Sequence, residues 1–209
     1  MLEAPSLNAV RNDMKEHPSA ICCILVAPNF SRLGYENIIL RFGYLDYRTG
    51  EDIHFYCAGY GGYWNKGSVP DMTDIGIGKY EGGTVIPWAF SQRLFGAFVN
   101  ELEEETRWKY SGGSEIIILE PGVGFSRCIV FKLDSMIADE IIKDPGELFE
   151  ALIQHARTHK KIGGFSLKNI GTISGEEIVN SVISLLPKPF ENLLNIWKKG
   201  KHYTLVDIS

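Results

Sequence analysis

The stretch DIHFYCAGYGGYWNKG, residues 52–67, contains the change of pattern on which the fold depends. Its first seven residues alternate between two faces, which is the period of a β-strand, and His54 and Tyr56 share one of these faces. From Gly59 onward the alternation gives way to glycines, tyrosines and a tryptophan. We therefore expect a strand over 52–58, followed by a segment without regular structure.

This second segment, residues 59–87, is long, rich in glycine and without sustained periodicity. A connection of that length in a compact domain is usually functional or disordered. Its aromatic residues argue against disorder, because disordered segments contain few of them. We interpret 59–87 as an aromatic, Gly-rich loop that contacts a partner through Tyr60, Tyr63 and Trp64, since Tyr and Trp provide large, stiff contact areas.

Upstream of this stretch, the sequence predicts a helix over 6–16, where apolar residues recur at helical spacing. The continuous apolar run 20–27 is typical of a strand that is buried on both faces. We interpret 33–44 as a helix. A hairpin that pairs 44–47 with 53–56 across the Arg-Thr-Gly-Glu turn is the alternative, and the sequence leaves it open.

Downstream, hydrophobic periodicity and capping signals predict the remaining elements. These are a helix over 89–106, an antiparallel pair of strands over 114–120 and 127–133, helices over 134–142 and 145–159, a helix that Ser174 and Glu177 cap, a helix from Pro189, and a last strand over 203–208. We expect one globular domain over 1–209, with a core at about 19–159 and a C-terminal helical extension at about 165–209.

The fold class that this order predicts is α/β (or α+β), with a mixed central sheet flanked by helices and with C-terminal helices added. Over about residues 19–159, the order βαβ followed by αββα resembles that of the thioredoxin-like fold. Where a redox member of that fold would carry two cysteines, this chain has APNFSRLG, residues 27–34. The resemblance therefore implies the fold without thiol–disulfide exchange, and a different mixed topology is the alternative.

Composition narrows the function classes. The 209 residues are 44% hydrophobic and 22% charged, and the formal net charge is −5. That acidic balance argues against nucleic acid as a partner. The longest apolar run, 20–27, is too short to cross a membrane, and the N-terminal residues lack the pattern of a signal peptide. We expect a soluble, cytoplasmic protein whose four cysteines are reduced thiols.

Glycines that follow a strand can bring backbone amides close to a phosphate, and Gly59, Gly61 and Gly62 have that position. No helix opens directly after them, as a dinucleotide site requires. The alternative function is an enzyme or sensor that acts on a nucleotide or another small phosphorylated molecule at the C-terminal ends of the first two strands. Its ligand-binding candidates are Asn29, Ser31, Arg32, Tyr60 and Lys66.

Two histidine patterns suggest chemistry. His155 and His159 are spaced i, i+4, which suits a metal ion, but we expect no metal there because the sequence offers no third ligand. Histidines in the last turn of a helix also interact favourably with its dipole. Asp52 and His54 lie on the same face of their strand and are a candidate acid–base pair.

The sequence contains no recognisable set of catalytic residues and indicates no cofactor. It does contain segregated charges, with acids at 101–105 and bases at 157–161 and 198–202. Together with the aromatic segment 59–87, these charges favour a binding or assembly component. Its partner would be another protein or further copies of the same chain.

Overall fold

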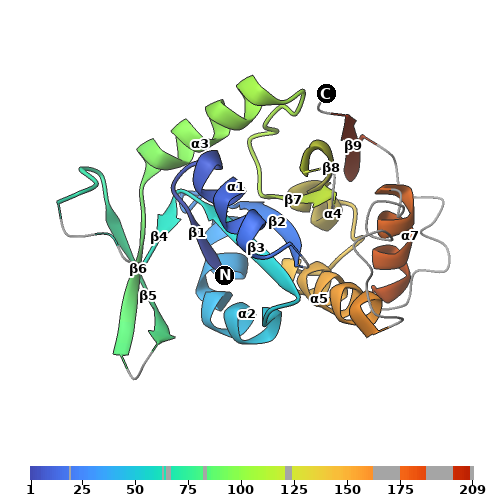
Figure 1. Ribbon diagram of the computed structural model, residues 1–209, viewed down its shortest axis with the longest axis horizontal. Helices are drawn as coiled ribbons and strands as arrows, with labels where there is room; N and C mark the ends of the chain where they lie inside the picture. Colours follow the sequence, from blue (N-terminus) through green and yellow to red (C-terminus); the bar gives the residue numbers. More distant parts are fainter. Residues whose placement is uncertain are drawn as a thin grey trace.

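The computed structural model describes residues 1–18, 20–62, 64, 67–81, 84–120, 124–161, 175–186 and 200–207. Its centre is a six-stranded sheet of order β1-β3-β2-β7-β8-β9 (Figure 1). The strands are β1 (Leu2–Ala4), β2 (Ile21–Val26), β3 (Ile53–Ala58), β7 (Glu115–Glu120), β8 (Gly124–Lys132) and β9 (Tyr203–Asp207). The mixed α/β class predicted from the sequence is confirmed.

The sheet is parallel on one side and antiparallel on the other. Strand β3 pairs in parallel with both β1 and β2, whereas β7 pairs antiparallel with β2 and β8. Strand β9 completes the sheet, antiparallel to β8. The central place of β2 follows from its sequence, because Ile24, Leu25 and Val26 are all fully buried and the strand exposes neither face to water.

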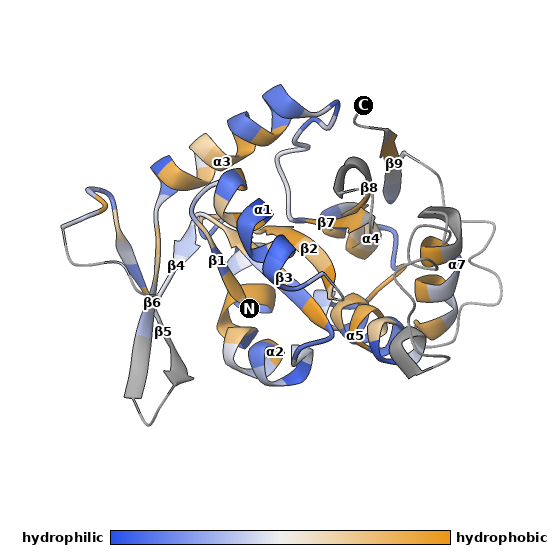
Figure 2. Ribbon diagram, viewed as in Figure 1, coloured by the Kyte–Doolittle hydropathy of each residue, from blue (hydrophilic) through white to orange (hydrophobic). Residues whose placement is uncertain are grey.

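Helices cover both faces of the sheet, and their apolar sides turn toward it (Figures 1 and 2). Alternate residues of β3 show the two layers, since Tyr56 bonds to α1 and Phe55 packs on Phe149 of α5. The helical elements are α1 (Leu7–Glu16), η1 (Leu33–Ile38), η2 (Ile39–Arg41), α2 (Phe42–Thr49), α3 (Gln92–Glu105), α4 (Leu133–Ala138), α5 (Pro145–Lys161) and α7 (Gly175–Leu185).

Most predicted helices are confirmed. Ser6 caps α1, because its hydroxyl accepts a hydrogen bond from the Ala9 amide at 3.3 Å. Residues 33–49 are helical, so the hairpin alternative is wrong. Helix α4 ends at Ala138, earlier than predicted, and α5 continues to Lys161. The predicted Ser174 cap and the helix from Pro189 lie outside the described residues.

The segment 59–87 is not a loop, and that prediction is wrong. It forms β4 (Tyr60–Gly61) and β5 (Thr73–Glu81), which join β6 (Thr84–Phe90) in a three-stranded sheet of order β4-β6-β5. The β5–β6 hairpin extends away from the central sheet in Figure 1. The alternation is hidden because the β5–β6 register shifts between Asp74 and Gly78, which is the effect of a bulge.

The helix predicted over 89–106 begins later in the structure, because its first residues belong to the same three-stranded sheet. Residues 84–90 belong to β6, and α3 begins only after Ser91. The Ser91 hydroxyl accepts from the Leu94 amide at 3.0 Å and donates to the Asp71 carboxylate at 2.6 Å. Cap and carboxylate together fix the boundary between strand and helix.

In the part of the chain that the structure describes, no helix combines the length and the apolar composition that crossing a membrane requires.

Candidate functional site

The connection between β2 and β3 carries a group of exposed apolar side chains. Leu40, Tyr44 and Tyr47 expose 49%, 55% and 86% of their surface, and Phe30 exposes 65%. Among the side chains whose burial the structure describes, the exposed large hydrophobic ones all lie between residues 30 and 47. Large apolar residues gathered on one exposed segment indicate an interaction surface.

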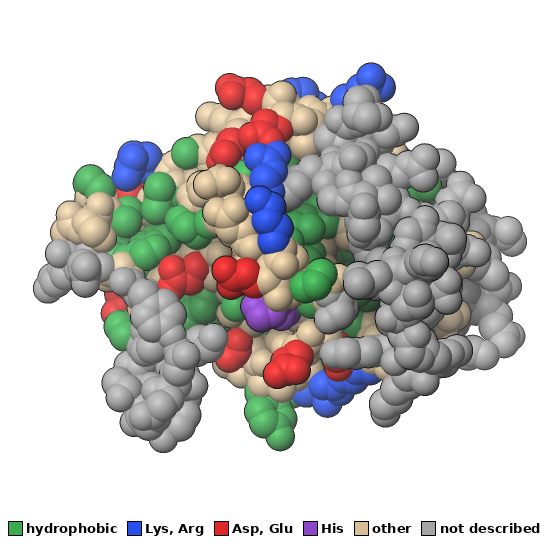
Figure 3. Space-filling model, viewed as in Figure 1, with side chains coloured by type: hydrophobic (Ala, Val, Ile, Leu, Met, Phe, Trp, Pro, Cys, Tyr) green, Lys and Arg blue, Asp and Glu red, His purple; other side chains and the backbone are tan. Residues whose placement is uncertain are grey.

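Three of these side chains lie on one face of the helix that η2 and α2 form. Leu40, Tyr44 and Tyr47 are spaced i, i+4, i+7, which aligns them along a helix. The opposite face holds Phe42 and Leu45, which are buried in the core. We call Leu40, Tyr44 and Tyr47 the α2 surface. Hydrophobic side chains protrude at the lower edge of Figure 3, where Figure 1 places α2.

A cavity of about 610 Å³ opens beside the α2 surface, between α2 and α5. Its wall includes Arg41 and Tyr44 on one side and Asp144, Phe149 and Glu150 on the other. That volume is within the range of cavities that hold a ligand or an inserted side chain. The α2 surface is therefore adjacent to a cavity, and Tyr44 belongs to both.

Two ion pairs border this cavity. Arg41 lies 2.9 Å from Asp144, and Arg48 lies 2.6 Å from Glu150. The Tyr44 hydroxyl also donates to Glu150, at 2.8 Å. The hydrogen bond from Arg48 holds the pKa of Glu150 below its ordinary value, and Tyr44 adds to the effect. Pairing keeps the Glu150 carboxylate ionised, so this side chain offers hydrogen bonding at the cavity rather than an acid–base group.

The predicted ligand residues near the end of β2 have structural contacts. The Ser31 hydroxyl accepts from the Gly34 amide at 2.9 Å, and Arg32 lies 3.0 Å from Glu36. The Oδ1 atom of Asn29 is buried without a hydrogen-bond partner in the described part of the chain. Lys66 is outside the described residues.

The predicted contact residues of the 59–67 stretch differ from one another. Tyr60 is fully buried and donates its hydroxyl to the Ala27 carbonyl at 2.6 Å, so its ring forms part of the core and not of a surface. Trp64 is half-buried, and its indole covers Gly61 so closely that a Cβ there would collide with the ring. Tyr63 lies outside the described residues.

Of the histidines in the two predicted patterns, His54 and His155 have contacts within the fold, and the side chain of His159 lies outside those that the structure describes. His155 is buried, and its Nδ1 atom lies 2.8 Å from the Ser181 hydroxyl of α7, which is a packing role. The Asp52 carboxylate lies 4.0 Å from Arg157. His54 lies instead beside Asp13 of α1, at 3.5 Å, so the expected Asp52–His54 pair is replaced by a pair between two elements.

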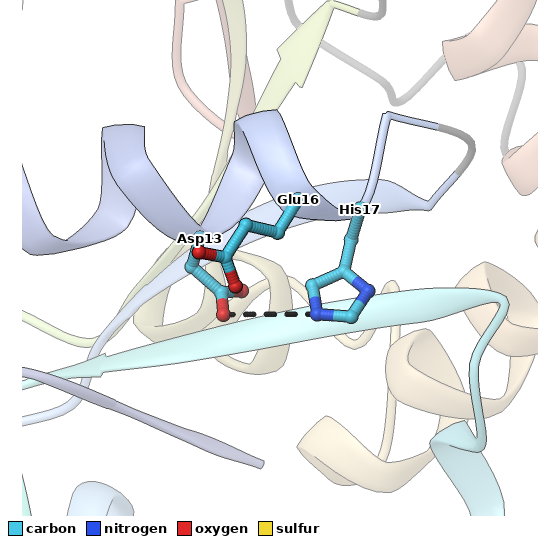
Figure 4. Close-up of side chains that lie close together, drawn as sticks. All are labelled: Asp13, Glu16 and His17. Carbon is cyan, nitrogen blue, oxygen red and sulfur yellow. Dashed lines mark ion pairs between the residues drawn. The ribbon is translucent and has the colours of Figure 1, made fainter.

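A second cluster of polar side chains lies where α1 ends over β3. Figure 4 shows Asp13 and Glu16 of α1 together with His17, which caps the helix. His54 of β3 lies beside Asp13. The face in Figure 3 shows histidine flanked by acidic side chains at this place. Burial lowers the pKa of His54, and the nearby His17 adds to the effect, while Asp13 opposes it.

The sequence contained one signal for this cluster. In DMKEH, residues 13–17, the acids and the histidine are spaced i, i+3, i+4, which places them on one helix face. In the sequence, the i, i+4 spacing of His155 and His159 resembled a metal site more closely, because both residues are histidines. The contribution of His54 could not be read from the sequence, because it depends on the packing of α1 against β3.

The protein is thus a mixed α/β protein with two distinct surface features. One is the exposed helix face of the α2 surface, and the other is the cluster of carboxylates and imidazoles at the end of α1. The chain matches no protein-family model, no curated protein and no solved structure.

Proposed function

We propose that this chain is a binding or assembly component that contacts a protein partner through the α2 surface. The observation that carries the proposal is the alignment of Leu40, Tyr44 and Tyr47, all exposed, on one helix face. A solvated helix face normally carries polar residues, whereas this one carries two tyrosines and a leucine. Burial of such side chains is what stabilises protein interfaces.

The surroundings of the α2 surface support a protein rather than a small ligand. Tyr and Arg are the residue types that dominate binding energy at interfaces, and Arg41 borders the surface beside Tyr44. The adjacent cavity of about 610 Å³ provides a place for one apolar anchor from the partner. A partner segment would lie along α2 and insert that anchor between α2 and α5.

The segment 59–87 is close enough to take part. Strand β5 packs against α2, so a partner on the α2 surface could also reach the β5–β6 hairpin. Contacts of Tyr63 and Trp64 with a partner stay a prediction. Of the two residues, the structure describes only Trp64, so Trp64 is the one to mutate. Tyr60 leaves the proposed contact set because it is buried.

The test is to place a photo-crosslinking amino acid at Tyr47 in the native host and identify what it captures. The matched control is the same amino acid at Glu104, an exposed position on α3. We expect one protein, or a second copy of this chain, to be captured from Tyr47 and not from Glu104. The Leu40→Ser change should reduce capture strongly without altering the fold. Equal capture from both positions, or capture that Leu40→Ser leaves unchanged, would contradict the proposal.

Sedimentation of the purified chain distinguishes a second copy of this chain from a different protein as the partner. Self-association through the α2 surface predicts that the sedimentation coefficient rises with concentration, and that the Leu40→Ser, Tyr47→Ser double change abolishes this rise. If the purified chain sediments as a monomer at all concentrations, it does not associate with itself. The partner that crosslinking captures must then be a different protein.

A nucleotide or another small phosphorylated ligand is the second candidate. The observation that favours it is the buried Oδ1 atom of Asn29, which has no donor in the described part of the chain. The Asn29 oxygen could accept a hydrogen bond from an amino or hydroxyl group of a nucleotide but would not bind its phosphate. The position of Tyr60 weakens this candidate, because its hydroxyl bonds to Ala27 between the ends of the two strands. A thermal-shift screen with nucleotides tests it, and the absence of any shift would remove it.

We also propose that the fold belongs with the thioredoxin-like arrangement. The parallel β2–β3 pair with a helical connection, followed by the antiparallel β7–β8 pair and α4, supports this. The region after β2 has Pro28 and Asn29 in place of cysteines, so the proposal includes no thiol–disulfide activity.

A further inference from the structure

Three potential metal ligands project from the C-terminal end of α1. Asp13, Glu16 and His17 are spaced i, i+3, i+4 and share one helix face. Their ligand atoms all lie within 4.8 Å of one another. Figure 4 shows the three side chains gathered on the same side of the helix end. The Nε2 atom of His17 is 3.9 Å from Oδ1 of Asp13, which is too long for a hydrogen bond. Asp13 and His17 therefore form a loose ion pair, drawn as the dashed line in Figure 4, at a distance that leaves room for an ion between them.

A fourth ligand approaches from the sheet. The Nδ1 atom of His54, on β3, lies 3.5 Å from Oδ2 of Asp13. That nitrogen is buried and has no hydrogen-bond partner in the described part of the chain. The rings of His17 and His54 are 4.8 Å apart between centroids. The contact with Asp13 is longer than an ordinary hydrogen bond and satisfies this buried nitrogen poorly, so an ion between the two groups would account for their arrangement.

We propose that Asp13, Glu16, His17 and His54 bind a divalent transition-metal ion, and that Zn²⁺ is the ion whose chemistry fits best. Imidazole nitrogens and carboxylate oxygens are ordinary zinc ligands. Ligands about 2.0–2.1 Å from a tetrahedral zinc lie about 3.4 Å from one another. His54 Nδ1 lies 3.5 Å from Oδ2 of Asp13, and His17 Nε2 lies 3.9 Å from Oδ1 of the same carboxylate, so the two imidazoles face its two oxygens at separations near that spacing.

The neighbours of Asp13 support the same assignment. The Tyr56 hydroxyl donates to Oδ2 of Asp13 at 2.7 Å, and such outer hydrogen bonds orient carboxylates that bind metals. The Cys22 thiol is 3.9 Å from the Tyr56 hydroxyl, and burial raises the pKa of that thiol to about 11. Cys22 is a buried neighbour of Tyr56, and the proposed set of ligands does not include it.

The side chains of the proposed ligands differ in their exposure to solvent, and this difference indicates the side from which an ion would enter. The side chain of His54 is 11% exposed, whereas that of His17 is 50% exposed. The sheet thus holds one ligand rigidly, and the end of α1 presents the others to solvent. An ion could exchange with solution from the α1 side without any opening of the core. This site is on a different element from the α2 surface, and its test does not depend on the proposed function.

The test uses the full chain, stripped with a chelator and titrated with Zn²⁺ by calorimetry. We expect one ion per chain. The exposed His17→Ala change should weaken binding at least about tenfold, and Tyr56→Phe by about 10–100-fold. His159→Ala and Glu104→Gln are matched controls that remove a histidine and an exposed acid elsewhere, and they should leave affinity unchanged. Mg²⁺ should not compete, because it prefers oxygen ligands.

Cobalt provides a second measurement that does not depend on any variant folding. Co²⁺ bound by mixed nitrogen and oxygen ligands in a four-coordinate site should give intense visible absorption, and Zn²⁺ should displace it. The proposal is overturned if Zn²⁺ binds without a defined stoichiometry, if His17→Ala binds as tightly as the native chain, or if His159→Ala abolishes binding. A cobalt spectrum identical to that of the aqueous ion would overturn it as well.

Discussion

The hydroxyl of Tyr60 donates a hydrogen bond to the carbonyl oxygen of Ala27 at 2.6 Å, and both residues are fully buried. Ala27 follows β2, and Tyr60 follows β3, so this bond joins the ends of two parallel strands. The Tyr60 ring also packs on Phe42 and Phe90. The place where an open α/β sheet commonly binds a ligand is filled here by a side chain of the protein itself.

Removal of the Tyr60 hydroxyl should be costly because the Ala27 carbonyl would lose its partner in a buried place. We expect Tyr60→Phe to lower the free energy of unfolding by about 1–3 kcal/mol, measured by urea denaturation. The control is Tyr47→Phe, whose ring is 86% exposed and whose effect should be within about 0.5 kcal/mol. Equal effects of the two changes would show that the Tyr60 bond contributes nothing.

Gly59 should tolerate no side chain. Its φ angle is +77°, and a Cβ would lie 2.6 Å from Cβ of Phe95. Both the left-handed backbone and the contact with α3 oppose Gly59→Ala, so we expect a loss of more than about 2 kcal/mol or failure to fold. Gly96→Ala is the matched control, since a Cβ there meets nothing within 4 Å inside a helix. It should stabilise the protein by about 0.5–1 kcal/mol, and thermal melts would distinguish the two outcomes.

Glu115 should make stability depend on pH. It is fully buried, accepts hydrogen bonds from the Trp108 indole at 2.8 Å and the Ser111 amide at 3.1 Å, and burial raises its pKa above the ordinary 4.5. The folded state therefore holds this proton more tightly than the unfolded state. As pH rises from about 4.5 through the raised pKa, the stability that Glu115 contributes must fall.

The measurement is the free energy of unfolding of the native chain and of Glu115→Gln, followed from pH 4 to about pH 8. We expect the native chain to lose stability relative to Glu115→Gln as pH rises. Each tenfold change in the acid constant corresponds to about 1.4 kcal/mol. Parallel curves for the two proteins would mean that burial does not perturb this carboxyl group.

All four cysteines should be unreactive in the folded protein. Cys22, Cys23, Cys57 and Cys128 are buried and form no disulfide. Burial raises the pKa of Cys128 to about 12 and that of Cys23 well above its ordinary value. Because the thiolate is the reactive form, a thiol-specific dye should label the native chain slowly and label all four sites in denaturant. Rapid labelling of Cys22 in the native state would contradict this expectation.

Much of the core could be read from the sequence. The run Ile21–Val26 has no polar residue, so only a strand buried on both faces accommodates it, and β2 lies at the centre of the sheet. Alternation placed His54 and Tyr56 on one face of β3, and the structure confirms that both reach Asp13. Local spacing succeeds in such cases because burial of one face determines the period.

The errors have physical causes that local spacing cannot reveal. The shift of register between Asp74 and Gly78 interrupts the alternation of β5, so two paired strands resembled a loop. Tyr60 was expected at a contact surface because tyrosines provide large, stiff contact areas, yet its ring is buried and its hydroxyl bonds to Ala27 between the strand ends. Aromatic residues fill cores as readily as they form interfaces, and the sequence does not distinguish these uses.

The sequence by itself determined the class of fold, the central strand and most of the helices, because apolar periodicity and helix caps act over a few residues. The tertiary structure alone decided which aromatic side chains face water, and it moved the candidate surface from 59–87 to Leu40, Tyr44 and Tyr47. It also brought His54 to Asp13, which is 41 residues away in the chain. Contacts between distant residues depend on how whole elements pack, and no short stretch of sequence contains that information.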